Sequence, residues 1–415
     1  MSQAGVLNSA SADITPVAPP MLAHDADPPP PPGAMGKLPG MQTATPWDTL
    51  AGQYQLHPGA TPAIVGQRPV LGAGRLGQLL RGQRGAQVSA SLGRLFTLCA
   101  HAHRRAAELA LAAAHPPTQL TAPAPVLLVL ETARDHLRSI ALDWPQRVPD
   151  AAPGAASLDW LRGCPLPLVS AHAVSDADAA WKTLAALRSW LENKVLGQGA
   201  AQWLIDQREP AALAHWCQTH AERLLPARCL AAWHPLASRL RPGLRSLDVL
   251  DADGAVQTAQ ITQLAQMISH VPDFVQHPTW RGQCAETGTW TRLRHRSAPA
   301  HPHSAWTRLS ARWLELIELA GAMPEDMTPL LASGALHLAP GQALAWCEMA
   351  RGLLLHWVQL DAEGAVQDYR VLAPTEWNFH PDGALGRAVA ALAPLDTAAA
   401  RALAAAFDPC VVCTV

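Results

Sequence analysis

The sequence ends in "FDPCVVCTV" (Phe407–Val415), and the two cysteines in this stretch have the spacing C-x-x-C. On a helical turn or a tight loop this spacing lets both sulfur atoms reach one metal ion, and thiolates suit iron, nickel, zinc and copper(I). The pair alone is a moderate signal, because half of a zinc ribbon has the same spacing and the sequence contains no second C-x-x-C pair. A metal site would therefore draw further ligands from elsewhere in the chain; otherwise the cysteines are incidental residues of a flexible tail.

The composition is that of a large folded protein. The 415 residues are 49% hydrophobic and 15% charged, which is enough apolar material for the core of one large domain or two. The formal net charge is −2, and the sequence has no basic patch. Nucleic acid is therefore not expected as a partner.

The start of the sequence predicts neither export nor membrane insertion. The first residues, "MSQAGVLNSASADITPVAPP", lack a charged region followed by an apolar one, and no uncharged apolar run in the chain reaches about 18 residues. The eight cysteines are too sparse for a disulfide framework in a chain of this length. We therefore expect a cytoplasmic protein, in which a C-x-x-C pair is more often a metal or redox site.

The chain divides into a tail and a helix-rich body. Residues 1–45 are rich in Pro, Ala, Ser and Gly, so we expect a disordered tail there and a single domain over 46–415. Two apolar runs joined by a turn at Glu363–Gly364 predict a β-hairpin over Arg351–Thr375. Helices are predicted by apolar residues at helical spacing over Arg75–Gly85, Gly93–His115, Ala124–Trp144, much of 175–270 and the segment before Cys410.

Further stretches resemble, in the right order, the signatures of nickel–iron hydrogenase large subunits. "FDPCVVCTV" resembles that family's C-terminal signature D-P-C-x-x-C-x-x-H, in which two residues separate the last Cys from a His, and "RLFTLCAHAH" (Arg94–His103) resembles its N-terminal signature R-x-C-G-x-C-x-x-x-H. The other matching stretches are "AETGTWTR" (285–292), "EMARG" with "LLLHW" (348–357) and "YRVLAPTEWNFHPDG" (369–383). The resemblance runs from about residue 67 to the end, and the shared order of the short motifs argues against coincidence.

The resemblance implies roles for the cysteines. In the family's enzymes the first cysteine of each C-x-x-C pair is a terminal nickel ligand, and the second bridges nickel and iron. In this chain Phe96 replaces the first cysteine of the N-terminal pair, while Cys99 keeps the second position. Cys410 falls at a nickel-terminal position and Cys413 at a bridging position. Both positions that contact iron are thus retained, whereas a phenyl ring, which cannot coordinate a metal, stands at one nickel position.

The end of the chain departs from the enzymes as well. Catalytic subunits continue beyond the C-terminal His into an extension that is removed after nickel insertion, whereas this sequence stops at Val415, one residue short of that His. This pattern resembles the HupK/HoxV family of hydrogenase maturation proteins, which are similar to large subunits without being enzymes. The resemblance implies a trimmed large-subunit fold, mainly α with a smaller β portion (α+β), in which the cysteine segments meet at the centre.

The same resemblance implies a function and a cargo. We expect a scaffold that transiently holds iron with its cyanide and carbon monoxide ligands, without nickel, before transfer to the hydrogenase large subunit. The expected partners are the maturation chaperones that assemble the iron unit and the apo large subunit that accepts it. Cys99, Cys413 and Cys410 are the candidate metal ligands.

Other residues match positions near the metal in the family. His103, four residues after Cys99, is a candidate hydrogen-bond donor to a sulfur or a diatomic ligand, with an ordinary half-buried histidine equally expected. Arg351 matches an arginine that projects over the metal centre, where it would donate to a cyanide nitrogen, and a surface ion pair is its alternative. Pro374 and Thr375 fall where the family contacts a cyanide, or else form a plain turn after a strand. Glu286 and Arg292 are expected to stabilise an internal ion pair.

Two other classes of function stay open at this point. A divergent hydrogenase large subunit or hydrogen sensor would need nickel, to which Phe96 is an objection. A zinc or thiol-redox protein would use Cys410 and Cys413, but this reading leaves the other matching motifs unexplained. Metal analysis of protein purified without air separates these readings, since they predict iron without nickel, both metals, or zinc.

Overall fold

The computed structural model describes residues 51–72, 74–115, 125–148, 158–168, 176–243, 245–251, 254–293, 303–324 and 330–415. The predicted Pro-rich tail over residues 1–45 lies outside these described residues. The tail and the domain boundary beside it therefore stay predictions. Within the described ranges no helix is both long enough and apolar enough to cross a membrane.

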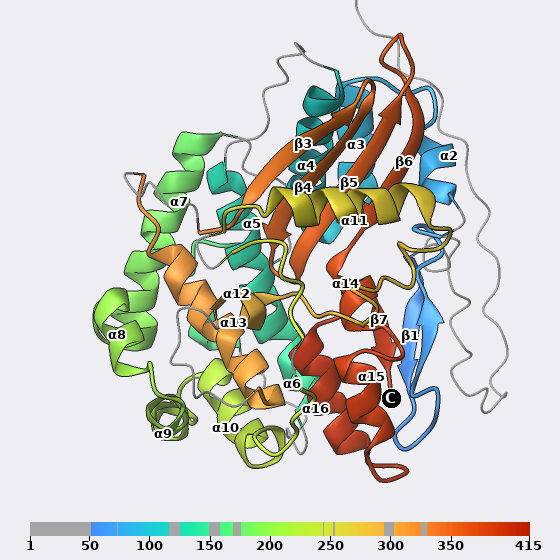
Figure 1. The fold of residues 1–415 in the computed structure, drawn as a ribbon. Coiled ribbons are helices and arrows are strands. Elements are labelled where there is room, and N and C mark those ends of the chain that lie inside the picture. The colour runs from blue at the N-terminus through green and yellow to red at the C-terminus, as the bar shows by residue number, and fades with distance from the viewer. Residues whose placement is uncertain are drawn as a thin grey trace, which may run out of the picture. The chain divides into compact units, whose positions relative to one another are not determined.

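Helices make up most of the described chain, as the periodicity predicts (Figure 1). Short 3₁₀ turns span Thr97–Cys99 and Leu158–Leu161, and π-helical segments span Ser139–Asp143 and Leu191–Leu196. The α-helices are α2 (Arg75–Leu80), α3 (Ala86–Leu95), α4 (Ala100–Ala114), α5 (Pro125–Arg138), α6 (Trp144–Arg147), α7 (Ala177–Trp190), α8 (Ala200–Asp206), α9 (Pro210–His220), α10 (Leu225–Ala237), α11 (Thr258–His270), α12 (Thr289–Leu293), α13 (Ala305–Ala320), α14 (Pro374–Asn378), α15 (Ala384–Ala390) and α16 (Thr397–Phe407).

A four-stranded antiparallel sheet forms the larger β portion, in the order β3 (Ser333–Ala339), β4 (Gln342–Met349), β5 (Gly352–Leu360) and β6 (Val366–Leu372). Figure 1 shows α11 lying across one face of this sheet and α4 behind the other. Because helices cover both faces, β4 and β5 are buried along nearly their whole length. The predicted β-hairpin is confirmed as β5 and β6, with Gly364 at a φ of 78° in the turn between them.

A smaller sheet joins the two ends of the described chain. Its strand order is β2 (Ile64–Gln67), β1 (Gln53–Leu56) and β7 (Val412–Thr414), with β1 antiparallel to β2 and parallel to β7. Tyr54 of β1 stands opposite Cys413 of β7. This pairing ties the C-terminal C-x-x-C stretch to β1, far away in the sequence.

Helix α13 lies at the centre of the helical half and packs against α5, α7, α8, α10, α12 and α16. Nearly all of its residues are buried, including Arg308, Arg312 and Glu315, so its charged side chains need partners inside the protein. Those partners lie outside α13, on segments close in the sequence to the candidate site residues. The helices and the two sheets together confirm the predicted fold class, mainly α with a smaller β portion (α+β).

Candidate metal centre

Cys99 and Cys410 line one cavity of about 340 Å³. Cys99 ends the 3₁₀ turn Thr97–Cys99 and stands at the N-cap position of α4, while Cys410 lies between α16 and β7. The other lining residues come from the start of the described chain, from the chain after β2, from the segment just before Cys99 and from the neighbour of Cys410: Ala51, Arg68, Val70, Arg94, Leu95, Phe96, Thr97, Leu98 and Val411. The structure thus brings the two cysteine segments together, as expected.

The Cys99 thiol is buried, which opposes its ionisation. Burial, followed by the negative charge of Glu131, raises the pKa of Cys99 well above the ordinary thiol value. Glu131 of α5 accepts hydrogen bonds from the backbone N–H groups of His101 and Ala102 at 2.8 and 2.9 Å, and so caps the first turn of α4. Because a metal binds the thiolate, loading Cys99 must release its proton.

Cys410 contacts a residue that the motif analysis singled out. Its sulfur lies 3.0 Å from Thr375 Oγ1, in the first turn of α14, and either atom can be the donor. Pro374 is the first residue of that helix, where its missing N–H costs no hydrogen bond. Thr375 is therefore positioned to fix the Cys410 side chain at the edge of the cavity.

Cys413 faces a different neighbourhood. It lies in β7 opposite Tyr54 and is not among the residues that line the cavity. Burial raises the pKa of Cys413 to about 11, although the nearby positive charge of Arg147 lowers it. The structure therefore places Cys410 with Cys99 on the cavity wall and Cys413 on the adjoining strand.

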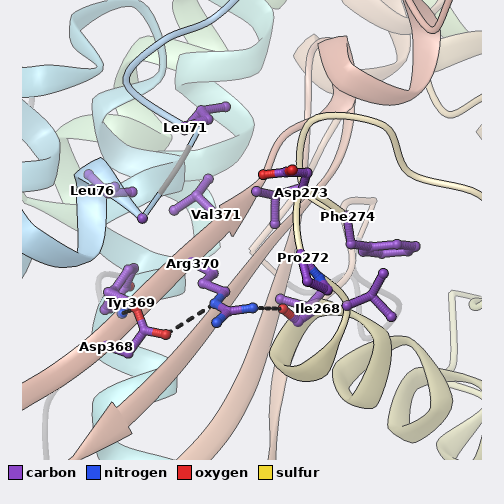
Figure 2. Close-up of a pocket in the computed structure, with 13 residues that line it drawn as sticks. Leu71, Leu76, Ile268, Pro272, Asp273, Phe274, Asp368, Tyr369, Arg370 and Val371 are labelled. Carbon is purple, nitrogen blue, oxygen red and sulfur yellow. Dashed lines mark hydrogen bonds and ion pairs between the residues drawn. The ribbon is translucent and has the colours of Figure 1, made fainter.

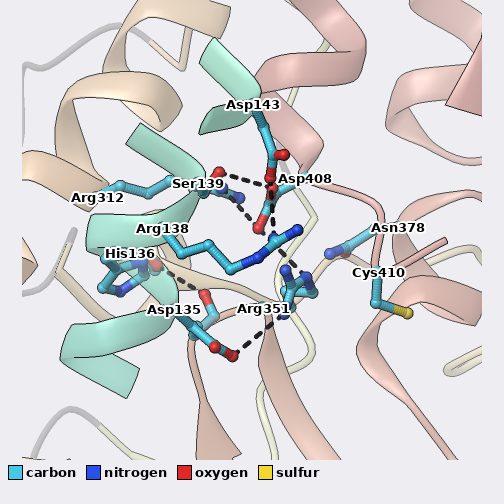
Figure 3. A network of polar contacts seen from close by, with 12 residues as sticks. Asp135, His136, Arg138, Ser139, Asp143, Arg312, Arg351, Asn378, Asp408 and Cys410 are labelled. Carbon is cyan, nitrogen blue, oxygen red and sulfur yellow. Dashed lines mark hydrogen bonds and ion pairs between the residues drawn. The ribbon is translucent and has the colours of Figure 1, made fainter. Parts of the chain in front are cut away.

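Arg351 is held by two buried carboxylates (Figure 3). Its Nη1 lies 3.4 Å from Asp135 Oδ2 and its Nε lies 3.3 Å from Asp408 Oδ2. Burial lowers the pKa of Arg351, but the charges of Asp408 and Asp135 outweigh that effect and raise it. Its charge is thus balanced inside the protein, and Arg351 is not among the residues that line the cavity.

Asp408 connects this network to the C-x-x-C stretch. Arg312 Nη1 lies 2.7 Å from Asp408 Oδ2, and Ser139 Oγ donates to Asp408 Oδ1 at 3.1 Å. Asp408 has a φ of 45°, a left-handed conformation that residues other than glycine seldom adopt. The buried ion pairs hold this turn, which directs the chain from α16 toward Cys410.

His103 lies behind Phe96. Its ring stacks on the Phe96 ring with centroids 3.9 Å apart, and its Nδ1 lies 3.0 Å from His356 Nε2. His356 Nδ1 lies in turn 2.7 Å from the Tyr369 hydroxyl. His103 therefore supports the Phe96 side of the cavity wall, and its hydrogen-bond partner among the described residues is His356.

The expectation for Glu286 and Arg292 holds, with a separate partner for each. Arg308 binds Glu286 at 2.7 Å, and Arg292 binds Glu315 at 2.9 Å. All four side chains are at least nine-tenths buried. These pairs connect α12 and α13 to the segment around residue 286, away from the cysteine cavity.

Arg68 is the cavity residue that sequence reasoning missed. It lies just after β2, matches no motif, and is 7% exposed on the same wall as the two cysteines. Its Nη1 lies 3.3 Å from Glu376 Oε1, and its guanidinium lies 6.0 Å from the Phe96 ring centroid. The pairing of β2 with β1, and of β1 with β7, brings Arg68 near the C-x-x-C stretch, which is far away in the sequence, so no local signal could have identified it.

The donor set around the cavity is small. Within the described ranges, no cluster of three or more His, Cys, Asp or Glu side chains is arranged to hold a metal ion. A first-row transition metal usually takes about four to six ligands. Among the described residues that line it, the cavity offers two soft donors, the thiols of Cys99 and Cys410.

A second cavity, of about 200 Å³, lies between the start of α2, the end of α11 and β6 (Figure 2). Its lining contains neither cysteine nor histidine. Arg370 in its wall is already engaged, with Nε 3.1 Å from Asp368 Oδ2 and Nη1 donating to the Ile268 carbonyl oxygen at 2.6 Å. This cavity offers no soft ligand, so the cysteine cavity is the candidate metal centre.

Comparison with known proteins shows that this chain is similar to nickel-dependent hydrogenases and to hydrogenase expression/formation proteins. The family model for nickel-dependent hydrogenase matches residues 303–415. The hydrogenase expression/formation protein HoxV of Cupriavidus necator is 39% identical over 398 residues, covering 88% of this chain and 95% of that protein. HupK of Bradyrhizobium diazoefficiens, with the same description, is 33% identical over 85% of this chain and 92% of its own length. An NAD⁺-reducing [NiFe]-hydrogenase in the H₂-reduced state aligns with 80% of this chain at 18% identity and a TM-score of 0.43.

Proposed function

Because the chain belongs to the family of HoxV and HupK hydrogenase expression/formation proteins, we propose that it is a non-catalytic scaffold in the maturation of a nickel–iron hydrogenase. Its cargo is an iron ion carrying two cyanides and one carbon monoxide, held for transfer to the hydrogenase large subunit. Scaffold and acceptor meet in the cytoplasm, and the chaperones that assemble the iron unit supply the cargo.

The observation that carries this proposal is the cavity shared by Cys99 and Cys410. Two thiolates supply soft ligands for iron, while the diatomic ligands of the cargo occupy the remaining coordination positions. Apolar and small side chains around the cysteines, such as Val70, Leu98 and Val411, leave room for ligands that are not donated by the protein.

Phe96 explains why nickel is not part of the cargo. Its ring lines the cavity close to Cys99 in the sequence, stacks on His103 and is 7% exposed. An aromatic ring offers no donor atom to nickel and fills space that a thiolate would need. Among the described residues, two thiols line this cavity, and so small a set also favours release, because few bonds must break at transfer.

The test is spectroscopy and metal analysis of protein purified without air from a host that makes the iron–cyanide–carbonyl unit. We expect infrared bands from bound cyanide and carbon monoxide, together with iron and no stoichiometric nickel. Stoichiometric nickel or hydrogen-oxidising activity in the isolated chain would contradict the proposal, and zinc as the principal metal would favour a thiol-bound zinc protein instead.

A further inference from the structure

Arg68 is a buried cation on the wall of the cysteine cavity. It lies directly after β2 and lines the cavity together with Cys99 and Cys410. The other arginine that lines the cavity, Arg94, is exposed. Because charges interact more strongly when they are removed from water, the charge of Arg68 acts on the cavity more than that of Arg94.

The hydrogen-bond donors of Arg68 are only partly used. Both hydrogen bonds of its guanidinium leave from Nη1 to the Glu376 carboxylate, at 3.3 and 3.5 Å. Its Nε is buried and has no hydrogen-bond partner among the described residues. A guanidinium has five N–H donors, and a buried donor without an acceptor is unfavourable. Nη2 also makes no hydrogen bond to the described residues and, unlike Nε, is not fully enclosed, so Nη2 is the accessible unused donor of this cavity-lining side chain.

Neighbours hold the guanidinium in place from two sides. Glu376 is the residue after Thr375 in α14, so one helical turn holds both Arg68 and Cys410. The Phe96 ring lies under the guanidinium. His103 stacks on the Phe96 ring, with a distance of 3.9 Å between the ring centroids. A guanidinium fixed in this way loses little conformational entropy when it binds a ligand.

We propose that Arg68 selects the cargo by its charge, donating a hydrogen bond to a cyanide nitrogen and disfavouring bare divalent cations in the same cavity. This inference rests on the proposed function. Ferrous iron with two cyanides and carbon monoxide is neutral, so its complex with two thiolates is doubly negative. A bare nickel or zinc ion with two thiolates is neutral. A buried positive charge stabilises the first complex more than the second.

Arg351 does not fill this role in the structure. Its positive charge already lies between the carboxylates of Asp135 and Asp408, and it is not on the cavity wall. Arg68 has a single carboxylate partner among the described residues, Glu376. Of these two arginines, Arg68 is therefore the one that lines the cavity and has a single carboxylate partner among the described residues.

Three variants test the proposal in a host that makes the iron–cyanide–carbonyl unit. Arg68→Met should lower the content of cyanide-bearing iron about tenfold, the effect of losing a charge-assisted hydrogen bond, and should raise the zinc and nickel content. Arg68→Lys keeps the charge but lacks the planar fork, so it should retain the cargo with cyanide bands displaced more than the carbon monoxide band. The double variant Arg68→Met with Glu376→Gln removes the carboxylate left unpaired, and should still lack the cargo.

The control is Arg370→Met, which removes a half-buried arginine that pairs with Asp368 and lines the second cavity, not the cysteine cavity. Per folded molecule, measured by circular dichroism, its cyanide and carbon monoxide bands should match those of the wild type. Wild-type bands together with unchanged bands in both Arg68→Met and Arg68→Lys would overturn the inference alone. Full recovery in the double variant would also overturn it, because the loss would then come from the stray charge of Glu376. If Arg68→Met does not fold, the test rests on Arg68→Lys. Displaced cyanide bands in that variant support the inference, and unchanged cyanide bands overturn it. A wild type without any bands would instead refute the proposed function.

Discussion

At the scale of single residues, the family resemblance and the structure differ on which C-terminal cysteine joins Cys99 as an iron ligand. The resemblance to large subunits pairs Cys99 with Cys413 as the iron ligands. The structure places Cys99 and Cys410 on the cavity and Cys413 on β7 opposite Tyr54. Sequence spacing alone could not separate these cases, because it does not show which way each sulfur faces.

Alanine variants of the cysteines distinguish the two assignments. On the cavity geometry, Cys410→Ala should abolish the cyanide and carbon monoxide bands as completely as Cys99→Ala, because iron would keep a single bond to the cavity. Cys217→Ala, a buried thiol in α9, is the matched control and should keep the bands. If Cys413→Ala loses the bands and Cys410→Ala keeps them, the resemblance describes the ligand set correctly and the cavity geometry does not.

The buried thiols also predict how stability depends on pH. Burial raises the pKa of Cys217 and of Cys229 to about 12, from the ordinary thiol value of 9.0. A group that binds its proton more tightly in the folded state stabilises the fold fully below the unfolded pKa, and this contribution is lost as pH rises toward the folded pKa. The free energy of unfolding should therefore fall between pH 9 and about 12.

Denaturant titrations at a series of pH values measure this loss. Each thiol should contribute a slope of about 1.4 kcal/mol per pH unit within that window. The double variant Cys217→Ala with Cys229→Ala should show a shallower alkaline decline than the wild type, whatever its stability at pH 7. Parallel curves for the two proteins would show that these thiols do not contribute.

At the scale of elements, the sequence predicted what is local and missed what depends on packing. The hairpin of β5 and β6 follows from its turn signal, and the helix predicted over Ala124–Trp144 is present as α5 with the π-helical segment after it. The single helix predicted over Gly93–His115 is wrong, because the 3₁₀ turn Thr97–Cys99 divides that stretch between the end of α3 and α4. The strands β3 and β4 were not predicted, because β4 is covered on both faces and its sequence lacks the alternation of a half-buried strand. Arg68 and Glu131 were missed for a related reason, since their roles arise from contacts between distant elements.

Helix α4 depends on another helix for its cap. Its N-cap residue is Cys99, whose side chain makes no capping hydrogen bond, and Glu131 of α5 accepts the first N–H groups instead. Glu131→Ala should destabilise the fold by about 2 kcal/mol, because two buried N–H groups lose their acceptor. Hydrogen exchange at the amides of His101 and Ala102 should accelerate, and Glu131→Gln, which keeps one acceptor oxygen, should have a smaller effect.

Exchange at these amides also reports on Cys99, since the first turn of α4 positions that residue. Glu131→Ala should therefore lower the content of bound iron even in molecules that remain folded. Unchanged exchange at both amides would show that another group caps the helix.

At the scale of the whole molecule, the candidate centre draws on segments near the beginning and near the end of the described chain. Arg68 follows β2, Cys99 precedes α4, Thr375 lies in α14 and Cys410 precedes β7. Sheet β2–β1–β7 brings the first and last of these segments together. The centre can therefore form only in a completely folded domain, which couples its formation to global stability.

Truncation from the N-terminus tests where that domain begins. Deleting residues 1–40 should leave soluble yield, unfolding temperature and iron content nearly unchanged, because the composition of this segment is too rich in proline and small residues to supply a core. Deleting residues 1–56 is the matched comparison, since it also removes β1, the central strand between β2 and β7. That longer deletion should lose the anchor of the C-x-x-C stretch and, with it, the bound iron. A fall in yield or iron content with the shorter deletion would show that residues 1–40 take part in the folded domain or in its loading.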